Sequence, residues 1–215
     1  MTEREQISLK AQTYFDDLWS RGDPWELETS EFEHKRYARL LEILRSPKYE
    51  RVLEIGCGSG TFTRLLAPRA QRLLALDVST KAIARAQSAQ DTPKQVEFRV
   101  ANIMDYDAEA EGPWDLIVMS ETVYFLGWLY SLFDVCWLAS QLFKATRDRG
   151  ELLLANLQGE IHGPLFLPGI IRTYEDLFAN LGYQPQDQDI FRGKKKGVDL
   201  EIAMLLLQKP AKQAG

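Results

Sequence analysis

The chain has 215 residues, of which 45% are hydrophobic, 27% charged and 11% aromatic, and its formal net charge is −5. These values fit one ordinary globular α/β domain with an additional segment, and the negative charge argues against nonspecific nucleic-acid binding as the main activity. The N-terminus lacks a signal pattern and the most apolar region, residues 125–139, is too short to span a bilayer. We therefore expect a cytoplasmic protein with no membrane partner, and its two cysteines predict no disulfide framework.

The first 46 residues precede the first predicted strand. Apolar residues recur at helical spacing over 6–20 and 32–44, and a turn with the sequence Arg-Gly-Asp-Pro-Trp-Glu (21–26) separates the two predicted helices. These helices either cover the domain or form a lid over a ligand. In the second interpretation Trp25 and Tyr37 face the ligand and contact the substrate.

A glycine-rich run follows the first predicted strand, over residues 52–55, and opens a helix. It carries glycines at alternate positions: Gly56, Gly58 and Gly60. Such a loop lets a ligand approach the main chain and is typical of a nucleotide-like cofactor site in a doubly wound sheet, although a tight turn alone also needs glycine. The dinucleotide fingerprint has its third glycine where this chain has Thr61. The run therefore points to an adenosine-bearing ligand without a pyrophosphate.

Strands and helices alternate behind this turn and end in two strand-like runs. The expected strands cover 72–76, 95–100, 115–119 and 151–156, and the expected helices cover 79–90, 129–146 and 173–181. The last two runs, about 184–191 and 201–208, are joined by a short turn with the sequence Gly-Lys-Lys-Lys-Gly (193–197), which permits an antiparallel hairpin and forbids a parallel crossover. We interpret the lysines of this turn as solvated.

The pattern predicts a Rossmann-like, doubly wound and mostly parallel sheet of seven strands with a C-terminal antiparallel hairpin and an N-terminal helical lid. We divide the chain into a lid or cover (1–46), a main domain (47–210) and a disordered tail (211–215).

Three motifs resemble those of class I S-adenosylmethionine (SAM)-dependent methyltransferases. They are residues 53–60 (Leu-Glu-Ile-Gly-Cys-Gly-Ser-Gly), 76–79 (Leu-Asp-Val-Ser) and 114–121 (Trp-Asp-Leu-Ile-Val-Met-Ser-Glu). A narrower resemblance, to the NodS-like methyltransferases, rests on residues 14–15 (Tyr-Phe), 23–25 (Asp-Pro-Trp), 30–37 (Ser-Glu-Phe-Glu-His-Lys-Arg-Tyr) and 120–126 (Ser-Glu-Thr-Val-Tyr-Phe-Leu). That group is named for an enzyme that N-methylates an amino sugar of a chitooligosaccharide.

The resemblance implies SAM as cofactor, S-adenosylhomocysteine as product and no metal. Asp77 can accept hydrogen bonds from both ribose hydroxyls, as the acidic residue of dinucleotide sites does; the alternative is a helix N-cap. Glu54 would lie below the methionine amino group, and the Ser120 carbonyl near it. Val78, Asn102 and Ile103 would enclose the adenine. The loop contacts would come from Gly56, Cys57, Gly58, Gly60 and Thr61.

The acceptor side is less defined by sequence. Glu121 and Tyr124 follow the fourth strand and could orient or deprotonate an acceptor amine; alternatively Glu121 caps the next helix and Tyr124 packs in the wall. His162 follows the fifth strand and either contacts the substrate or lies on the surface. Flat aromatic side chains such as Trp25 could stack on sugar rings.

We therefore expect a methyltransferase that acts on an amine of an amino sugar, an oligosaccharide or another small molecule, as a monomer or homodimer without nucleic acid. Three alternatives remain: an O- or carboxyl-methyltransferase, a nucleotide-binding module or NAD oxidoreductase, and a SAM-binding protein without turnover.

Overall fold

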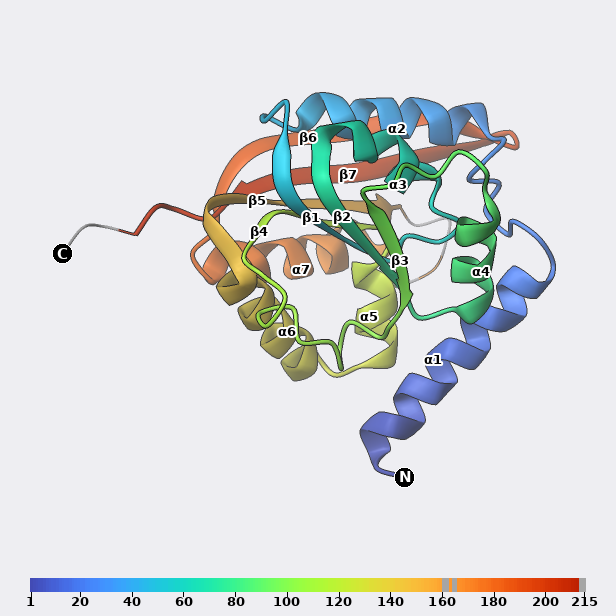
Figure 1. The fold of residues 1–215 in the computed structure, drawn as a ribbon, viewed down its shortest axis with the longest axis horizontal. Coiled ribbons are helices and arrows are strands. Elements are labelled where there is room, and N and C mark those ends of the chain that lie inside the picture. Colours follow the sequence, from blue (N-terminus) through green and yellow to red (C-terminus); the bar gives the residue numbers. More distant parts are fainter. Residues whose placement is uncertain (160–162, 164–165, 213–215) are drawn as a thin grey trace.

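The computed structural model describes residues 1–159, 163 and 166–212. A seven-stranded sheet forms the centre, with helices on both faces (Figure 1). The strands are β1 (Tyr49–Ile55), β2 (Ala70–Asp77), β3 (Val96–Val100), β4 (Trp114–Ser120), β5 (Thr146–Gln158), β6 (Gln184–Lys195) and β7 (Val198–Gln208). They lie in the order β3-β2-β1-β4-β5-β7-β6, and only β7 pairs antiparallel, with β5 and with β6. The predicted Rossmann-like, mostly parallel sheet with a C-terminal hairpin is confirmed.

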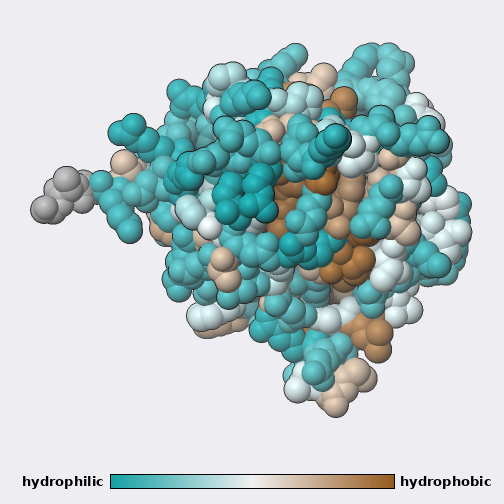
Figure 2. Space-filling view, viewed as in Figure 1, coloured by the Kyte–Doolittle hydropathy of each residue, from teal (hydrophilic) through white to brown (hydrophobic). Residues whose placement is uncertain are grey.

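Two layers of helices enclose the sheet. They are α1 (Glu3–Ser20), α2 (Glu31–Ile43), α3 (Thr61–Leu66) with the short 3-10 turn η1 (Ala67–Arg69), α4 (Thr80–Ser88), α5 (Val123–Leu129), α6 (Leu132–Ala145) and α7 (Pro168–Asn180). Successive strand residues point to opposite faces. Val52 of β1 packs in one core with Leu40 of α2, whereas the next residue, Leu53, packs in the other core with Leu142 of α6. On the side shown in Figure 1 the surface is mainly hydrophilic, with apolar side chains near its centre (Figure 2).

The single helix expected over 129–146 is wrong, because two helices meet there. Tyr130 is extended (φ −121°, ψ 158°), and Ser131 begins α6 with a capping box: its hydroxyl accepts from the Asp134 backbone and the Asp134 carboxylate accepts from the Ser131 backbone. The apolar spacing runs through this break, so the prediction missed it. α5 is therefore a short, separate helix that follows the carboxyl end of β4.

The C-terminal hairpin is longer than expected. β6 continues to Lys195 and β7 begins at Val198, so the turn is only Lys196-Gly197, both at positive φ (50° and 79°), as two-residue hairpin turns require. The interpretation of the lysines as solvated is wrong for Lys195, whose side chain is only 16% exposed.

The N-terminal segment is attached to the loops that follow β2 and β3. The Asp16 carboxylate of α1 accepts hydrogen bonds from Ser79 Oγ (2.6 Å) and Thr80 Oγ1 (2.8 Å), and Ser8 Oγ accepts from Asn102 Nδ2 (2.8 Å). Whether residues 1–46 act as a lid stays a prediction. Of the expected tail, residues 213–215 fall outside the described part of the chain. No helix among the described residues is long and apolar enough to cross a membrane.

Candidate active site

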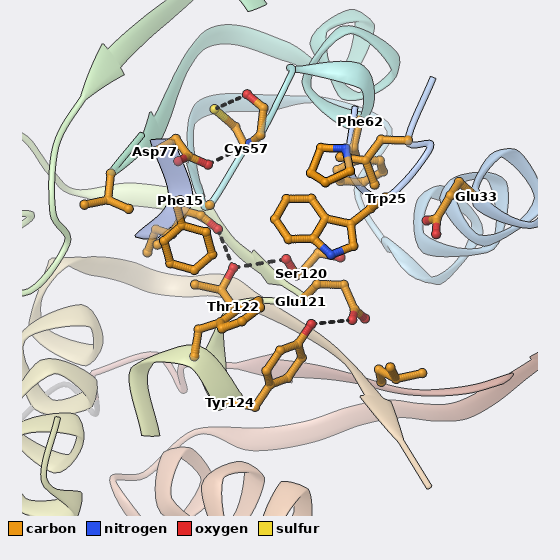
Figure 3. A pocket seen from close by; sticks show the side chains of 18 of the residues that line it. Phe15, Trp25, Glu33, Cys57, Phe62, Asp77, Ser120, Glu121, Thr122 and Tyr124 are labelled. Atoms are coloured by element: carbon orange, nitrogen blue, oxygen red, sulfur yellow. Dashed lines mark hydrogen bonds between the residues drawn. The ribbon is translucent and has the colours of Figure 1, made fainter. Parts of the chain in front are cut away.

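A cavity of about 590 Å³ lies at the carboxyl ends of β1, β2 and β4 (Figure 3). Its position is where open α/β sheets bind ligands, beside the point at which the strand order reverses between β1 and β4. Its volume is in the range of small-molecule sites. The N-terminal segment and the tip of the β6–β7 hairpin complete its walls.

Most of the residues predicted from the sequence line this cavity. They are Trp25, Tyr37, Glu54, Gly56, Cys57, Gly58, Asp77, Val78, Asn102, Ile103, Ser120, Glu121 and Tyr124. Gly60 and Thr61 are not among the lining residues, and His162 lies outside the described residues. The structure therefore brings together predicted residues from β1, β2, β4 and the segments that follow them.

Two glycines of the loop are needed for different reasons. Gly56 has φ +79°, and a Cβ there would lie 2.4 Å from Thr122 Oγ1. Gly60 has φ +73° and precedes α3, and a Cβ there would lie 2.5 Å from the Phe98 ring. Gly60 is thus needed for the backbone conformation of the turn and for the close contact with Phe98. Thr122, which sequence reasoning missed, places its hydroxyl 3.0 Å from the carbonyl oxygens of both Ile55 and Ser120 and so joins the ends of β1 and β4.

The Asp77 carboxylate holds the glycine loop. One oxygen accepts from the Gly58 backbone (2.8 Å) and the other from the Ser79 backbone (2.8 Å). The N-cap of α4 is Ser79, whose hydroxyl accepts from Ala82, so the N-cap alternative for Asp77 is wrong. Burial raises the pKa of Asp77 to about 6. Each carboxylate oxygen retains a lone pair that a ligand hydroxyl can use.

Glu54 is a buried carboxylate in the cavity wall, 4% exposed. Its Oε2 has no hydrogen-bond partner among the described residues. Burial, with a smaller contribution from the Asp77 charge, raises the pKa of Glu54 to about 7. Buried polar atoms are normally paired, so this oxygen is a place where a ligand N–H or O–H would bind.

The Asn102 side chain is already engaged. Its Nδ2 donates to Ser8 Oγ (2.8 Å) and to Tyr130 OH (2.6 Å), and its Oδ1 accepts from the Met104 backbone (3.1 Å). The amide therefore positions α1 and the end of α5. This arrangement leaves the backbone next to residue 102, rather than its side-chain amide, available to contact a ligand.

Glu121 and Tyr124 form a pair inside the cavity (Figure 3). The Tyr124 hydroxyl donates to Glu121 Oε2 (2.8 Å), while the buried Oε1 has no hydrogen-bond partner among the described residues. Burial raises the pKa of Glu121, and the Arg36 guanidinium opposes that shift. The helix-cap alternative for Glu121 is wrong, because Thr122 is the residue at the start of α5. Glu121 also has φ +57°, a sparsely populated conformation that is found preferentially at functional sites.

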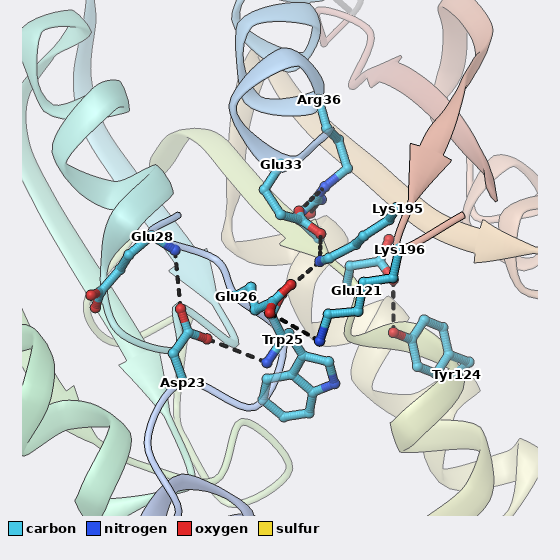
Figure 4. Close-up of polar contacts among 11 residues, drawn as sticks. Asp23, Trp25, Glu26, Glu28, Glu33, Arg36, Glu121, Tyr124, Lys195 and Lys196 are labelled. Carbon is cyan, nitrogen blue, oxygen red and sulfur yellow. Dashed lines mark hydrogen bonds and ion pairs between the residues drawn. The ribbon is translucent and has the colours of Figure 1, made fainter. Parts of the chain in front are cut away.

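The sequence analysis missed a group of three charged residues in the cavity wall, Glu33, Arg36 and Lys195 (Figure 4). Glu33 on α2 accepts from Arg36 Nε (2.7 Å) and from Lys195 Nζ (2.5 Å). Arg36 also donates to Ser120 Oγ (2.7 Å), and Lys195 to the Trp25 carbonyl (2.5 Å). In the sequence of an amphipathic helix such as α2, a Glu-x-x-Arg pair is typical of the solvent-exposed face. The structure differs from that expectation because the Glu33 carboxylate is buried and binds two cations.

The sequence profile of the family described as Nodulation protein S (NodS) matches residues 11–135. Nodulation protein S of Rhizobium tropici is 38% identical over 106 residues, 49% of this chain and 44% of that protein. The protein of the same name from Bradyrhizobium diazoefficiens is 36% identical over 105 residues, 48% of this chain and 49% of that protein. The matched part thus spans about half the length of these curated relatives.

Among solved structures, N-methyltransferase NodS from Bradyrhizobium japonicum WM9, in complex with S-adenosylhomocysteine, has a TM-score of 0.76. The sequence identity is 22%, and the match covers 93% of this chain and 98% of that one, which establishes the shared fold. The fold is that of class I SAM-dependent methyltransferases. Because the family profile covers more than half of the sequence, this chain belongs to the NodS family.

Proposed function

We propose that this protein is a SAM-dependent methyltransferase that methylates an amine nitrogen, in an amino sugar, an oligosaccharide or another small molecule. The observation that carries the proposal is the Glu121–Tyr124 pair, which presents an unpaired buried carboxylate oxygen inside a cavity at the end of β4. Family membership supports it, as does a 31% identity over 111 residues with Phosphoethanolamine N-methyltransferase 1 of Arabidopsis thaliana.

The cofactor half of the cavity has the groups that SAM needs. Asp77 offers carboxylate lone pairs to the ribose hydroxyls, and Glu54 offers its unpaired oxygen to the methionine ammonium. Val78 and Ile103 give an apolar wall for the adenine. When bound, SAM supplies an activated methyl group on a sulfonium centre.

The acceptor half has a group that can accept a proton. An amine is protonated at neutral pH and must lose that proton before its nitrogen can attack a methyl group. Glu121 Oε1 would accept a hydrogen bond from the ammonium and then take the proton. Tyr124 fixes the carboxylate through Oε2, so that only Oε1 faces the acceptor.

The N-terminal segment would enclose the reactants. Phe15 packs edge-on against Phe125 (centroids 4.9 Å), and Trp19 packs against Trp25 (5.5 Å). Trp25 lies between Asp77 on one side of the cavity and Glu121 on the other (Figure 3). We therefore propose residues 1–46 as a lid that excludes water, with Trp25 and Tyr37 as its ligand-facing residues.

Calorimetry and labelled methyl transfer test the proposal together. Calorimetric titration with SAM, S-adenosylhomocysteine and NAD should give binding of the first two only. Transfer of labelled methyl from SAM should then be measured across chitooligosaccharides, free amines and small carboxylic acids. Labelling of acids alone would refute the amine acceptor, binding of NAD without SAM would refute the cofactor, and binding without any transfer would leave a SAM-binding protein.

A further inference from the structure

Four charged side chains lie together at the acceptor side of the cavity, from three different parts of the chain (Figure 4). Glu33 and Arg36 are 6% and 3% exposed, and the Lys195 side chain is 16% exposed. The fourth is the buried carboxylate of Glu121. Ion pairs this deeply buried are costly unless their charges are balanced.

The charges balance only when all four residues are counted together. Glu33 binds two cations, Arg36 at 2.7 Å and Lys195 at 2.5 Å, so this triad has a formal charge of +1. The Glu121 carboxylate has no cation within ion-pair distance among the described residues. Its compensation is therefore the surplus charge of the triad, which reaches it through Arg36 and the Ser120 hydroxyl next to it.

The remaining groups around Glu121 do not supply this charge. Tyr124 is a neutral donor, and the Leu157 backbone of β5, which also faces the carboxylate, is an uncharged donor. At the rim, Lys196 is paired with Glu26 (2.9 Å), so these two charges cancel locally. Lys195 is thus the residue that turns a neutral Glu33–Arg36 pair into a net cation.

We propose that Lys195, at the tip of the C-terminal hairpin, is a positioning residue for the acceptor side: its charge on Glu33 gives the Glu33–Arg36 pair a surplus positive charge, which balances Glu121 and keeps that carboxylate ionised. The inference rests on the proposed role of Glu121. Lys195 forms no ion pair with Glu121 among the described residues, and its effect would pass through Glu33 and Arg36. The pKa of Glu121 is raised by burial and lowered by Arg36, which agrees in sign with this balance.

A charge-balance role makes a prediction that a purely structural role does not. Lys195→Met should move the ionisation of Glu121 to higher pH by up to about one unit, because a charge that acts through Glu33 and Arg36 has a smaller effect than one in direct contact. Glu33→Gln should move it to lower pH. The double variant Glu33→Gln/Lys195→Met has the same net charge as the wild type and should restore the midpoint, and Lys195→Arg should preserve it. Lys194→Met, on the exposed neighbour that pairs with Asp199, is the matched control.

The readout is the infrared carboxyl band of Glu121, identified in each protein by its loss on Glu121→Gln and followed against pH without substrate. The rate of methyl transfer should also be measured against pH, with the amine that the acceptor panel identifies. The pH at which this rate falls on the acid side should shift in parallel with the infrared midpoint. Restoration by the double variant would support the proposal. A midpoint unchanged in Lys195→Met, or further disturbed in the double variant, would overturn it. If no amine is methylated while the infrared midpoints shift as expected, the proposed function fails and the charge balance stands.

Discussion

Replacing Asp77 by asparagine removes one negative charge from the cofactor half of the cavity with little change in shape. In the wild-type protein each carboxylate oxygen already accepts one backbone N–H, from Gly58 and from Ser79, at 2.8 Å. An amide can keep only one of these bonds, because its NH₂ group would face the other backbone donor. It also loses the charge that would strengthen hydrogen bonds from the ribose hydroxyls.

The expected loss follows from the value of a charge-assisted hydrogen bond. Such a bond contributes about 1.5–3 kcal/mol, so losing it raises the Kd for SAM by about 10- to 150-fold. Folding stability should change much less, since the buried carboxylate whose pKa is raised to about 6 is itself costly to ionise. Asp77→Asn should therefore lower the affinity for SAM without a comparable loss of folding stability.

Calorimetry with SAM and a thermal melt of the same samples measure the two quantities. Asp115→Asn is the matched control: that carboxylate accepts from the Arg51 backbone (2.7 Å) and pairs with Arg147 (2.7 Å) at the opposite edge of the sheet. The control should lower the melting temperature and leave the affinity for SAM unchanged. An Asp77→Asn protein that melts like the wild type and binds SAM equally well would remove Asp77 from the proposed site.

Three further predictions follow from the same contacts. Glu121→Gln should lower kcat for the amine acceptor by about 100- to 10,000-fold with unchanged SAM affinity, measured by labelled transfer and calorimetry; equal kcat would exclude Glu121 as the proton acceptor. SAM affinity should fall as the pH is lowered through about 7 and then about 6, because Glu54 and then Asp77 become protonated and lose their charge toward the ligand. The ligand-free protein should gain stability from the same two groups as the pH falls, because their folded pKa values lie above the usual values; a pH-independent affinity would contradict this. Lys209→Met should lower the free energy of unfolding by about 1–2 kcal/mol in a denaturant titration, because Lys209 Nζ donates to two carbonyl oxygens at the end of α6 at 2.7 Å. Lys212→Met is the control, and equal effects of the two substitutions would refute the reasoning.

That the residues proposed for cofactor binding line one cavity could be predicted, because their positions are local in sequence. Glu54, the glycine loop and Asp77 sit at strand ends or directly after them, and parallel strands bring their carboxyl ends to one edge of the sheet. The start of α6 was also present in the sequence, as Ser131 and Asp134 at capping-box spacing, but the uninterrupted apolar pattern favoured one long helix.

The buried charges could not be predicted in the same way. Glu33 and Lys195 are 162 positions apart, and nothing in either local sequence distinguishes them from surface residues. Their meeting depends on the length of the hairpin, since β6 must extend to Lys195 for its side chain to reach α2. A two-residue turn rather than a five-residue one decides whether that lysine is solvated or buried.

Some of the cavity residues lie in the part of the chain that the family profile matches and others do not. This limits what can be inferred about the acceptor of this protein from its relatives. The family profile ends at residue 135, so it includes the glycine loop, Asp77 and the Glu121–Tyr124 pair but not the hairpin. Lys195, Val198, Leu200 and Ile202, which complete the acceptor side of the cavity, all lie beyond the matched region. Specificity depends on the whole set of contacts that an acceptor meets. Membership of the family therefore agrees with an acceptor that differs from that of other family members, which is why the acceptor panel must extend beyond chitooligosaccharides.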